Sequence, residues 1–166
     1  MSETDQQEKS ARLAFVHIDD VPWREVIAQM HGTKRVSVHE KFLEWTAQQM
    51  VVLGRYDPGV TVERHGHKSN HLVYVLEGEL LVGDRACPAG TLIVLELGAR
   101  FGPLIAGNAG ALLFEVWMGD PGPVPADKEG YYALLRARGI ERLPPPKIER
   151  PASAPPRSNE GGKQYG

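Results

Sequence analysis

Short runs of β-forming residues, each ended by a turn, are the feature that most limits what this chain can fold into. The runs cover residues 36–39, 49–56, 60–65, 72–76, 79–82, 91–95 and 111–118. Asp57-Pro58-Gly59, Glu77-Gly78 and Gly83-Asp84 are expected to be turns between them. Strands this short and this evenly separated predict an all-β fold, a sandwich or barrel of antiparallel strands.

Two segments depart from the strand pattern and are expected to be helical. Residues 21–30 predict a short N-terminal helical segment, with Pro22 near its start. Residues 128–138 predict a C-terminal surface helix that Asp127 caps and Gly139 ends. Its side bearing Tyr131, Leu134 and Leu135 is expected to pack against the barrel.

The chain of 166 residues has the length of one domain. Residues 1–10 are polar and charged, and residues 144–166 are rich in proline, so both ends are expected to be extended or disordered. The folded domain is therefore expected to span residues 11–143, with the core of its barrel at about residues 50–118.

Charge and composition exclude several classes of protein. The 19 basic and 21 acidic residues give a net charge of −2, which offers no electrostatic attraction to nucleic acid or to an anionic membrane. The sequence also has no apolar run of the ~20 residues that span a bilayer, and no signal-peptide pattern. The single cysteine, Cys87, cannot form an internal disulfide, which favours a reducing cytoplasm. A small molecule is the expected partner.

Three of the six histidines, His65, His67 and His71, fall within seven residues. Side chains two apart on a strand share a face, so His65 and His67 can reach one ion, and a short polar turn can bring His71 to it. Imidazole suits zinc, iron, nickel and copper, and three protein ligands leave positions for water or substrate. The alternative is a polar surface hairpin with solvated histidines. His17, His31 and His39 are expected to lie outside the site.

The segment around these histidines resembles the first motif of the cupin superfamily, in which a glycine precedes a His-x-His pair and a second glycine follows. Gly59, His65, His67 and Gly78 fall on the motif positions, and His71 stands where the family often has glutamate.

The second cupin motif is matched only in part. Gly83 and Pro88-Ala89-Gly90 match its beginning. Phe101 stands where this motif usually supplies its histidine ligand, and no histidine follows His71.

The resemblance implies an antiparallel jelly-roll β-barrel with a metal inside near one mouth. It implies a divalent transition metal, with iron first and nickel, zinc or manganese as alternatives, and non-haem iron oxygenase chemistry on a small oxygen-rich molecule. A non-catalytic binding or sensing barrel and a metal-assisted isomerase or lyase remain open as alternatives. Pairing of such barrels through their outer sheets implies a homodimer.

Two glutamates are candidate catalytic residues. Glu96 follows an apolar run and precedes a turn, so it is either a carboxylate at the rim, able to act as a fourth metal ligand or a general base, or an exposed turn residue. Glu115 interrupts an apolar strand and shares a face with Leu113 and Trp117. It faces either the pocket or solvent.

Overall fold

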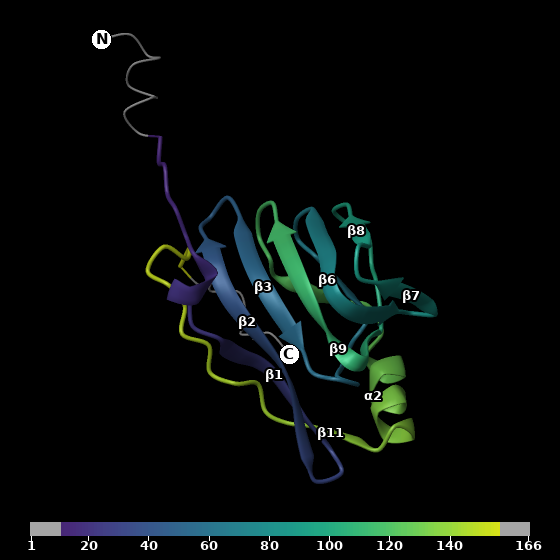
Figure 1. The fold of residues 1–166 in the computed structure, drawn as a ribbon. Helices are drawn as coiled ribbons and strands as arrows, with labels where there is room; N and C mark the ends of the chain where they lie inside the picture. The colour runs from purple at the N-terminus through teal and green to yellow at the C-terminus, as the bar shows by residue number, and fades with distance from the viewer. Residues whose placement is uncertain (1–10, 157–166) are drawn as a thin grey trace, which may run out of the picture.

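The computed structural model describes residues 11–156, and this part of the chain is built mainly of antiparallel strands (Figure 1). A 3-10 turn, η1 (Ile18–Asp20), precedes the strands, and one α-helix, α2 (Lys128–Ala137), follows most of them. The strands are β1 (Arg24–His31), β2 (Lys34–Trp45), β3 (Met50–Tyr56), β4 (Thr61–Val62), β5 (His65–His67), β6 (His71–Val82), β7 (Arg85–Pro88), β8 (Leu92–Leu95), β9 (Leu104–Trp117), β10 (Pro123–Pro125) and β11 (Ile140–Arg142). The predicted all-β architecture is confirmed.

The main sheet has the order β11-β1-β2-β3-β9-β6-β7, and β5 pairs with β10 in a separate two-stranded sheet. One half of β9 pairs with β3, whereas its first residues pair with β4. β6 likewise pairs with β8 at its start and with β7 at its end. Because the two halves of β6, and likewise of β9, pair with different strands, the sheet folds over on itself and encloses an interior.

β6 corrects one expectation, because residues 72–76 and 79–82 are not separate strands. They form one strand whose register against β9 shifts on both sides of Gly78. Gly78 has a φ of +71°, and a Cβ there would lie 2.0 Å from the carbonyl oxygen of Gly110. The glycine therefore marks a bend packed closely against β9, where the sequence indicated a turn.

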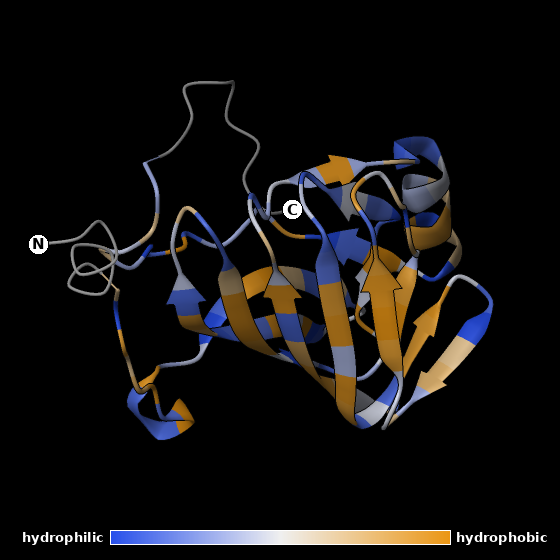
Figure 2. Cartoon of the chain, turned by 90° about the horizontal axis from the view of Figure 1, so that it is seen from above, coloured by the Kyte–Doolittle hydropathy of each residue, from blue (hydrophilic) through white to orange (hydrophobic). Residues whose placement is uncertain are grey.

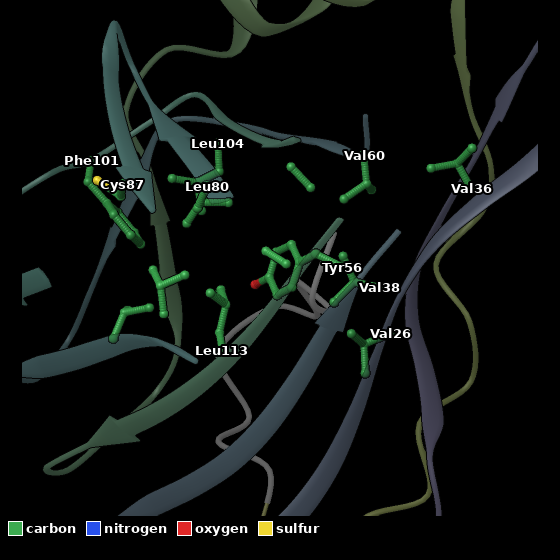
Figure 3. Close-up of a cluster of buried hydrophobic side chains, with 14 of the residues drawn as sticks. Val26, Val36, Val38, Tyr56, Val60, Leu80, Cys87, Phe101, Leu104 and Leu113 are labelled. Carbon is green, nitrogen blue, oxygen red and sulfur yellow. The ribbon is translucent and has the colours of Figure 1, made fainter. Parts of the chain in front are cut away.

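The interior between the layers is filled by apolar side chains from all parts of the sheet (Figure 3). Val38, Val60, Val75 and Leu80 have no exposed surface. The strands carry hydrophobic stretches interrupted by hydrophilic positions (Figure 2). Burial alternates along the first residues of β6, as expected for a sheet with one face buried. Within residues 11–156, no helix combines the length and hydropathy needed to cross a membrane.

The expected helix at residues 21–30 is wrong, because most of this segment is strand β1. A bulge at residues 25–27 shifts the strand register against β2 and disturbs the alternation in the sequence. Gln29 adds a polar residue to the buried face, where its amide donates to the carbonyl of Thr61 and accepts from the N–H of Thr61 at 2.8 and 2.9 Å. In the sequence, a glutamine that is buried and hydrogen-bonded cannot be told from an exposed one, so Gln29 is compatible with the polar face of a helix.

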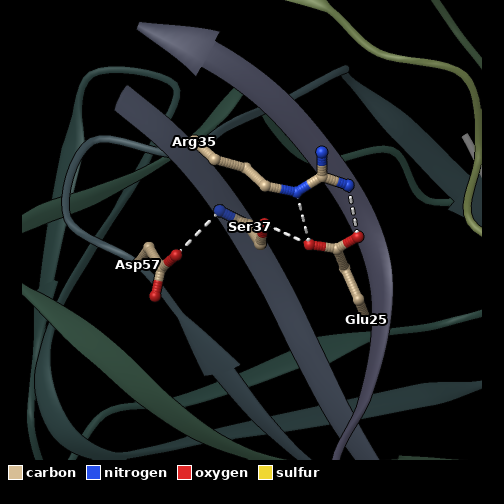
Figure 4. Close-up of polar contacts among 4 residues, drawn as sticks. All are labelled: Glu25, Arg35, Ser37 and Asp57. Atoms are coloured by element: carbon tan, nitrogen blue, oxygen red, sulfur yellow. Dashed lines mark hydrogen bonds and ion pairs between the residues drawn. The ribbon is translucent and has the colours of Figure 1, made fainter. Parts of the chain in front are cut away.

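Polar contacts fix β1 against β2 (Figure 4). The Arg35 guanidinium donates two hydrogen bonds to the Glu25 carboxylate, and the Ser37 hydroxyl donates a third. The backbone N–H of Ser37 donates to Asp57, which follows β3. These contacts join β1, β2 and the end of β3 near the start of β2, whereas Trp45 lies at the other end of β2.

The C-terminal part of the domain packs against the strands. α2 begins at the predicted cap, Asp127, whose carboxylate accepts from the N–H of Gly130, and its buried side carries Tyr131 and Leu135. Beyond β11, residues 144–156 form no helix or strand and pass back alongside β1 (Figure 1). There Ile148 packs against the core, so this part of the expected disordered tail is extended and in contact with the sheet. Residues 1–10 and 157–166 lie outside the described residues.

Candidate functional site

A cavity of about 60 Å³ lies in the interior enclosed by the sheet, bordered by β1 to β6, β9 and β10. A water molecule needs roughly 10–15 Å³ measured in the same way, so the cavity has room for a few waters or one small molecule. Its lining is mostly apolar. The polar side chains in it are Glu40, Tyr56, Glu63, His65, His67, His71 and Glu115.

The structure brings the three predicted histidines together. His65 and His67 lie at the ends of β5, and His71 is the first residue of β6. The ring centroids of His65 and His67 are 4.9 Å apart, and those of His67 and His71 are 4.7 Å apart. His67 and His71 are buried, so the alternative of a solvated surface hairpin does not hold for them. His17, His31 and His39 do not line the cavity.

Backbone carbonyls fix the tautomers of the two histidines of β5. Nδ1 of His65 lies 2.7 Å from the carbonyl oxygen of Glu63, and Nδ1 of His67 lies 2.7 Å from that of Pro121. Each Nδ1–H therefore donates, and each Nε2 keeps its lone pair. Burial lowers the pKa of His65, and burial with the nearby His71 and His65 lowers the pKa of His67 to about 3. Both rings are neutral at physiological pH.

A carboxylate fixes the third histidine. Nε2 of His71 lies 3.0 Å from Oε2 of Glu115, and the hydroxyl of Tyr56 donates to Oε1 of the same carboxylate at 3.2 Å. The His71 ring stacks on Trp117, with centroids 4.2 Å apart and an interplanar angle of 11°. Tyr56, Glu115 and His71 thus form a buried hydrogen-bonded chain that holds the His71 ring.

Two imidazole nitrogens in this cluster are left without a partner. Nε2 of His67 and Nδ1 of His71 are buried and make no hydrogen bond with the described residues. Leaving such atoms unpaired costs about 1–3 kcal/mol each, which a ligand at the site would offset. As the rings stand, no group of three His, Cys, Asp or Glu side chains within residues 11–156 is placed to hold a metal ion.

The donor chemistry of the cluster nevertheless fits a transition metal. Metal-bound histidines usually donate their other ring N–H to a carbonyl or carboxylate, and all three imidazoles have such a contact. Coordination by His65, His67 and His71 together requires their rings to turn toward one point.

Phe101 borders the histidine cluster at the position where the sequence lacks a second-motif histidine. Its ring centroid lies 5.1 Å from that of His65 and 5.9 Å from that of His71. Its backbone forms two hydrogen bonds with His65, of 3.0 and 2.9 Å. Phe101 therefore supplies an apolar wall to the site instead of a ligand.

The two candidate catalytic glutamates lie in different places. Glu115 on β9 faces the interior and is only 4% exposed. Of the two positions that the sequence left open, the pocket and the solvent, the structure shows the pocket. Glu96 is exposed in the turn after β8 and does not line the cavity. The catalytic role predicted for Glu96 therefore has no support from its position, whereas Glu115 is part of the site.

Sequence reasoning missed Glu40 and Tyr56. Glu40 on β2 is 5% exposed and lines the cavity. It pairs with Gly54 on β3, where a Cβ would lie 3.2 Å from the Tyr56 ring and 3.6 Å from Oε1 of Glu115. The missing side chain at Gly54 leaves room for these polar groups. The signal was available, because Glu40 stands in the alternating series with Val36 and Val38.

Comparison with solved structures shows cupin folds. A candidate acetylacetone dioxygenase from Methylibium petroleiphilum PM1 is 13% identical with a TM-score of 0.58, over 78% of this chain and 96% of that one. The polyketide cyclase RemF from Streptomyces resistomycificus is 19% identical with a TM-score of 0.55, over 76% and 96%. A sugar phosphate isomerase of the cupin superfamily from Silicibacter pomeroyi is 20% identical with a TM-score of 0.55, over 70% and 83%. At these identities the likeness establishes the fold alone.

Comparison at the level of sequence gives the family. No curated protein matches the chain. The family model described as the ChrR cupin-like domain matches residues 11–117, which include η1, β1–β9 and the whole histidine cluster. The chain belongs to the ChrR cupin-like domain family, within the cupins.

Proposed function

We propose that this protein is a metal-binding cupin that acts on a small oxygen-rich molecule through a divalent transition metal, iron first, held by His65, His67 and His71. The observation that supports it most is the hydrogen bonding of the three imidazoles. Each has one ring nitrogen engaged by a carbonyl or carboxylate oxygen, which leaves the other nitrogen as a donor to an ion. Two of those donor nitrogens are buried and unpaired.

The surrounding residues have separate tasks in this proposal. A bound dication supplies a Lewis acid that orients the oxygen atoms of a substrate and stabilises its anionic form. Glu115 accepts a hydrogen bond from His71 and is itself held by the hydroxyl of Tyr56. Phe101 and Trp117 keep bulk water from the imidazoles. Glu115 is the carboxylate placed to hold or move a proton at the site.

Metal content of protein purified without a histidine tag tests the site. We expect close to one equivalent of iron, nickel, zinc or manganese in the wild type. His67→Ala should lose it, because the variant removes a buried donor, whereas His17→Ala should keep it because His17 is exposed and outside the cavity. A chelator should lower the melting temperature of the wild type and of His17→Ala, and leave that of His67→Ala unchanged. Equal metal in all three proteins, or none after reconstitution, would contradict the proposal.

Oxygen consumption separates the reaction classes. Iron-loaded protein is mixed with small diketones or hydroxy acids in an oxygen electrode. We expect uptake that depends on substrate and disappears in His67→Ala. Turnover that continues under nitrogen would favour the isomerase or lyase alternative.

A binding barrel without metal is the second candidate function. It is favoured by the present placement of the histidine rings, which do not converge within the described residues, and by the mostly apolar lining of the cavity. Tight binding of a small molecule to metal-free protein, without turnover, is the result expected from this candidate.

A further inference from the structure

The cavity has a second polar feature besides the histidines and Glu115. The Glu40 side chain lines it, and its Oε2 is buried without a hydrogen-bond partner among the described residues. An unpaired buried carboxyl oxygen lowers the stability of the folded protein. Val26 and Ile27 of β1, the strand paired with β2, also line the cavity and are apolar. None of the interactions described for the histidine cluster uses this oxygen.

We propose that Glu40 is a ligand-binding residue that donates a hydrogen bond from its carboxyl group to a carbonyl or hydroxyl oxygen of a small neutral molecule in the cavity. The proposal rests on the function proposed above, because it names the chemical class of the molecule that the same cavity takes.

The charges around the cavity favour a neutral ligand. Glu40, Glu63 and Glu115 are its ionisable acids, and its other titratable groups are Tyr56 and the three histidines. No lysine or arginine is among the lining residues, so away from a metal at the histidines a free anion meets no fixed counter-charge in the cavity. A protonated carboxyl, in contrast, can donate to an uncharged oxygen without burying a charge.

The protonation state of Glu40 agrees with this role. Burial, and then the negative charge of Glu115, raise the pKa of Glu40 to about 8. At neutral pH the carboxyl is therefore largely protonated and can donate. Its register partner on β3 is Gly54, which carries no side chain to pair with it. The ligand would then lie with its oxygen at Glu40 and its hydrocarbon part against Val26 and Ile27.

Two substitutions of Glu40 test whether its side chain acts as a neutral hydrogen-bond donor to the ligand. Glu40→Gln keeps the shape and a neutral donor, whereas Glu40→Leu keeps the volume and removes the donor. Binding of acetylacetone, acetone and propane-1,2-diol is measured by ligand-observed NMR, with propionate and propylammonium as charged probes. We expect the wild type to bind at least one neutral probe, Glu40→Gln to bind it within about threefold, and Glu40→Leu to bind it about tenfold more weakly.

Several outcomes would overturn the inference. They are the absence of binding of every neutral probe, a loss in Glu40→Gln as large as in Glu40→Leu, or a preference for propylammonium. Infrared difference spectra of the unmodified protein give a reading that does not depend on the folding of Glu40→Leu. The neutral probe should shift a protonated carboxyl band that Glu40→Gln lacks, and an unshifted band also overturns the inference.

Metal content measured on the same samples keeps the two proposals apart. Equal metal in the wild type and in both Glu40 variants shows that Glu40 acts on the ligand and not through the histidines. Neutral-probe binding that follows the expected order in protein that takes up no metal on reconstitution would overturn the metal site and leave the role of Glu40 standing.

Discussion

At the scale of the residue, the buried carboxyl of Glu40 links stability to pH. Burial raises its pKa from 4.5 to about 8, so between these pH values the folded state keeps a proton that the unfolded state has lost. The contribution of Glu40 to stability is therefore full below about pH 4.5 and is lost as the pH rises to about 8. Glu40→Gln, which cannot ionise, removes this dependence.

Urea denaturation of the wild type and Glu40→Gln at pH 5 and pH 8 measures this effect. We expect the free energy of unfolding of the wild type to fall relative to that of the variant by on the order of a few kcal/mol between the two pH values. All other titrating groups are shared and cancel in the difference. Parallel profiles would show that Glu40 ionises freely in the folded state.

Single residues were predicted from the sequence where the pattern was local. His65, His67 and His71 are close in the chain, so strand periodicity and one turn were enough to place them together. Tyr56 and Glu115 are 59 positions apart and meet only through the pairing of β3 with β9. Long-range contacts of this kind depend on the sheet order, which no local pattern encodes.

At the scale of the element, β5 depends on a glycine between its two histidines. A Cβ at Gly66 would lie 2.2 Å from the carbonyl oxygen of Ala99, which is backbone and cannot rotate away. The strand of the histidine pair and the loop before Phe101 thus approach too closely for any side chain at position 66.

Gly66→Ala is expected to force these two segments apart. The cost of overpacking is typically about 1–3 kcal/mol, which for a chain of this size lowers the melting temperature by roughly 3–10 °C. Arg64→Ala, at an exposed position two residues earlier, should melt like the wild type. Thermal denaturation followed by circular dichroism is the measurement, and an unchanged melting temperature for Gly66→Ala would exclude the close approach.

Elements were predictable where apolar and turn residues followed a simple period. α2 was placed from its cap and its apolar side, and most strands from their alternation. β1 was mistaken for a helix because a bulge and the buried Gln29 broke its alternation. Two strands were predicted in place of β6 because glycine is typical of turns. In the structure Gly78 bends one continuous strand.

At the scale of the whole molecule, the segment after β11 belongs to the folded domain. Ile148 packs on the core, Ala154 packs on the cluster of Trp45, Met50, Val52 and Trp117, and the Arg150 guanidinium lies over the Trp45 ring at 4.7 Å. Its proline content predicted an extended or disordered chain, but a few apolar contacts are enough to hold residues 144–156 against the sheet.

Ile148→Ala tests whether this segment stabilises the domain. Loss of a partly buried isoleucine side chain should lower the free energy of unfolding by about 1–2 kcal/mol. Glu149→Ala, which breaks only the exposed ion pair with Arg24, should cost under about 0.5 kcal/mol. Equal effects of the two substitutions in urea denaturation would show that the segment does not pack on the core.

The outer face of the sheet is the other feature of the whole molecule. Tyr74, Leu76, Leu92, Val94 and Phe114 on β6, β8 and β9 are exposed there. Contiguous apolar surface of this kind is typical of contact sites between proteins. The homodimer expected from the resemblance stays a prediction, and this face is the surface that would form it.

The backbone pairing of Phe101 with His65 has a consequence for how sites of this kind change over evolutionary time. The two hydrogen bonds that join these residues use only main-chain atoms, so they place a side chain beside the histidines whatever its identity. The side chain at position 101 can therefore change without a change in the pairing of the backbone. One codon change there can add or remove a polar group at the cluster while the strands keep their pairing, which gives a lineage a short mutational route between different chemistries in one barrel.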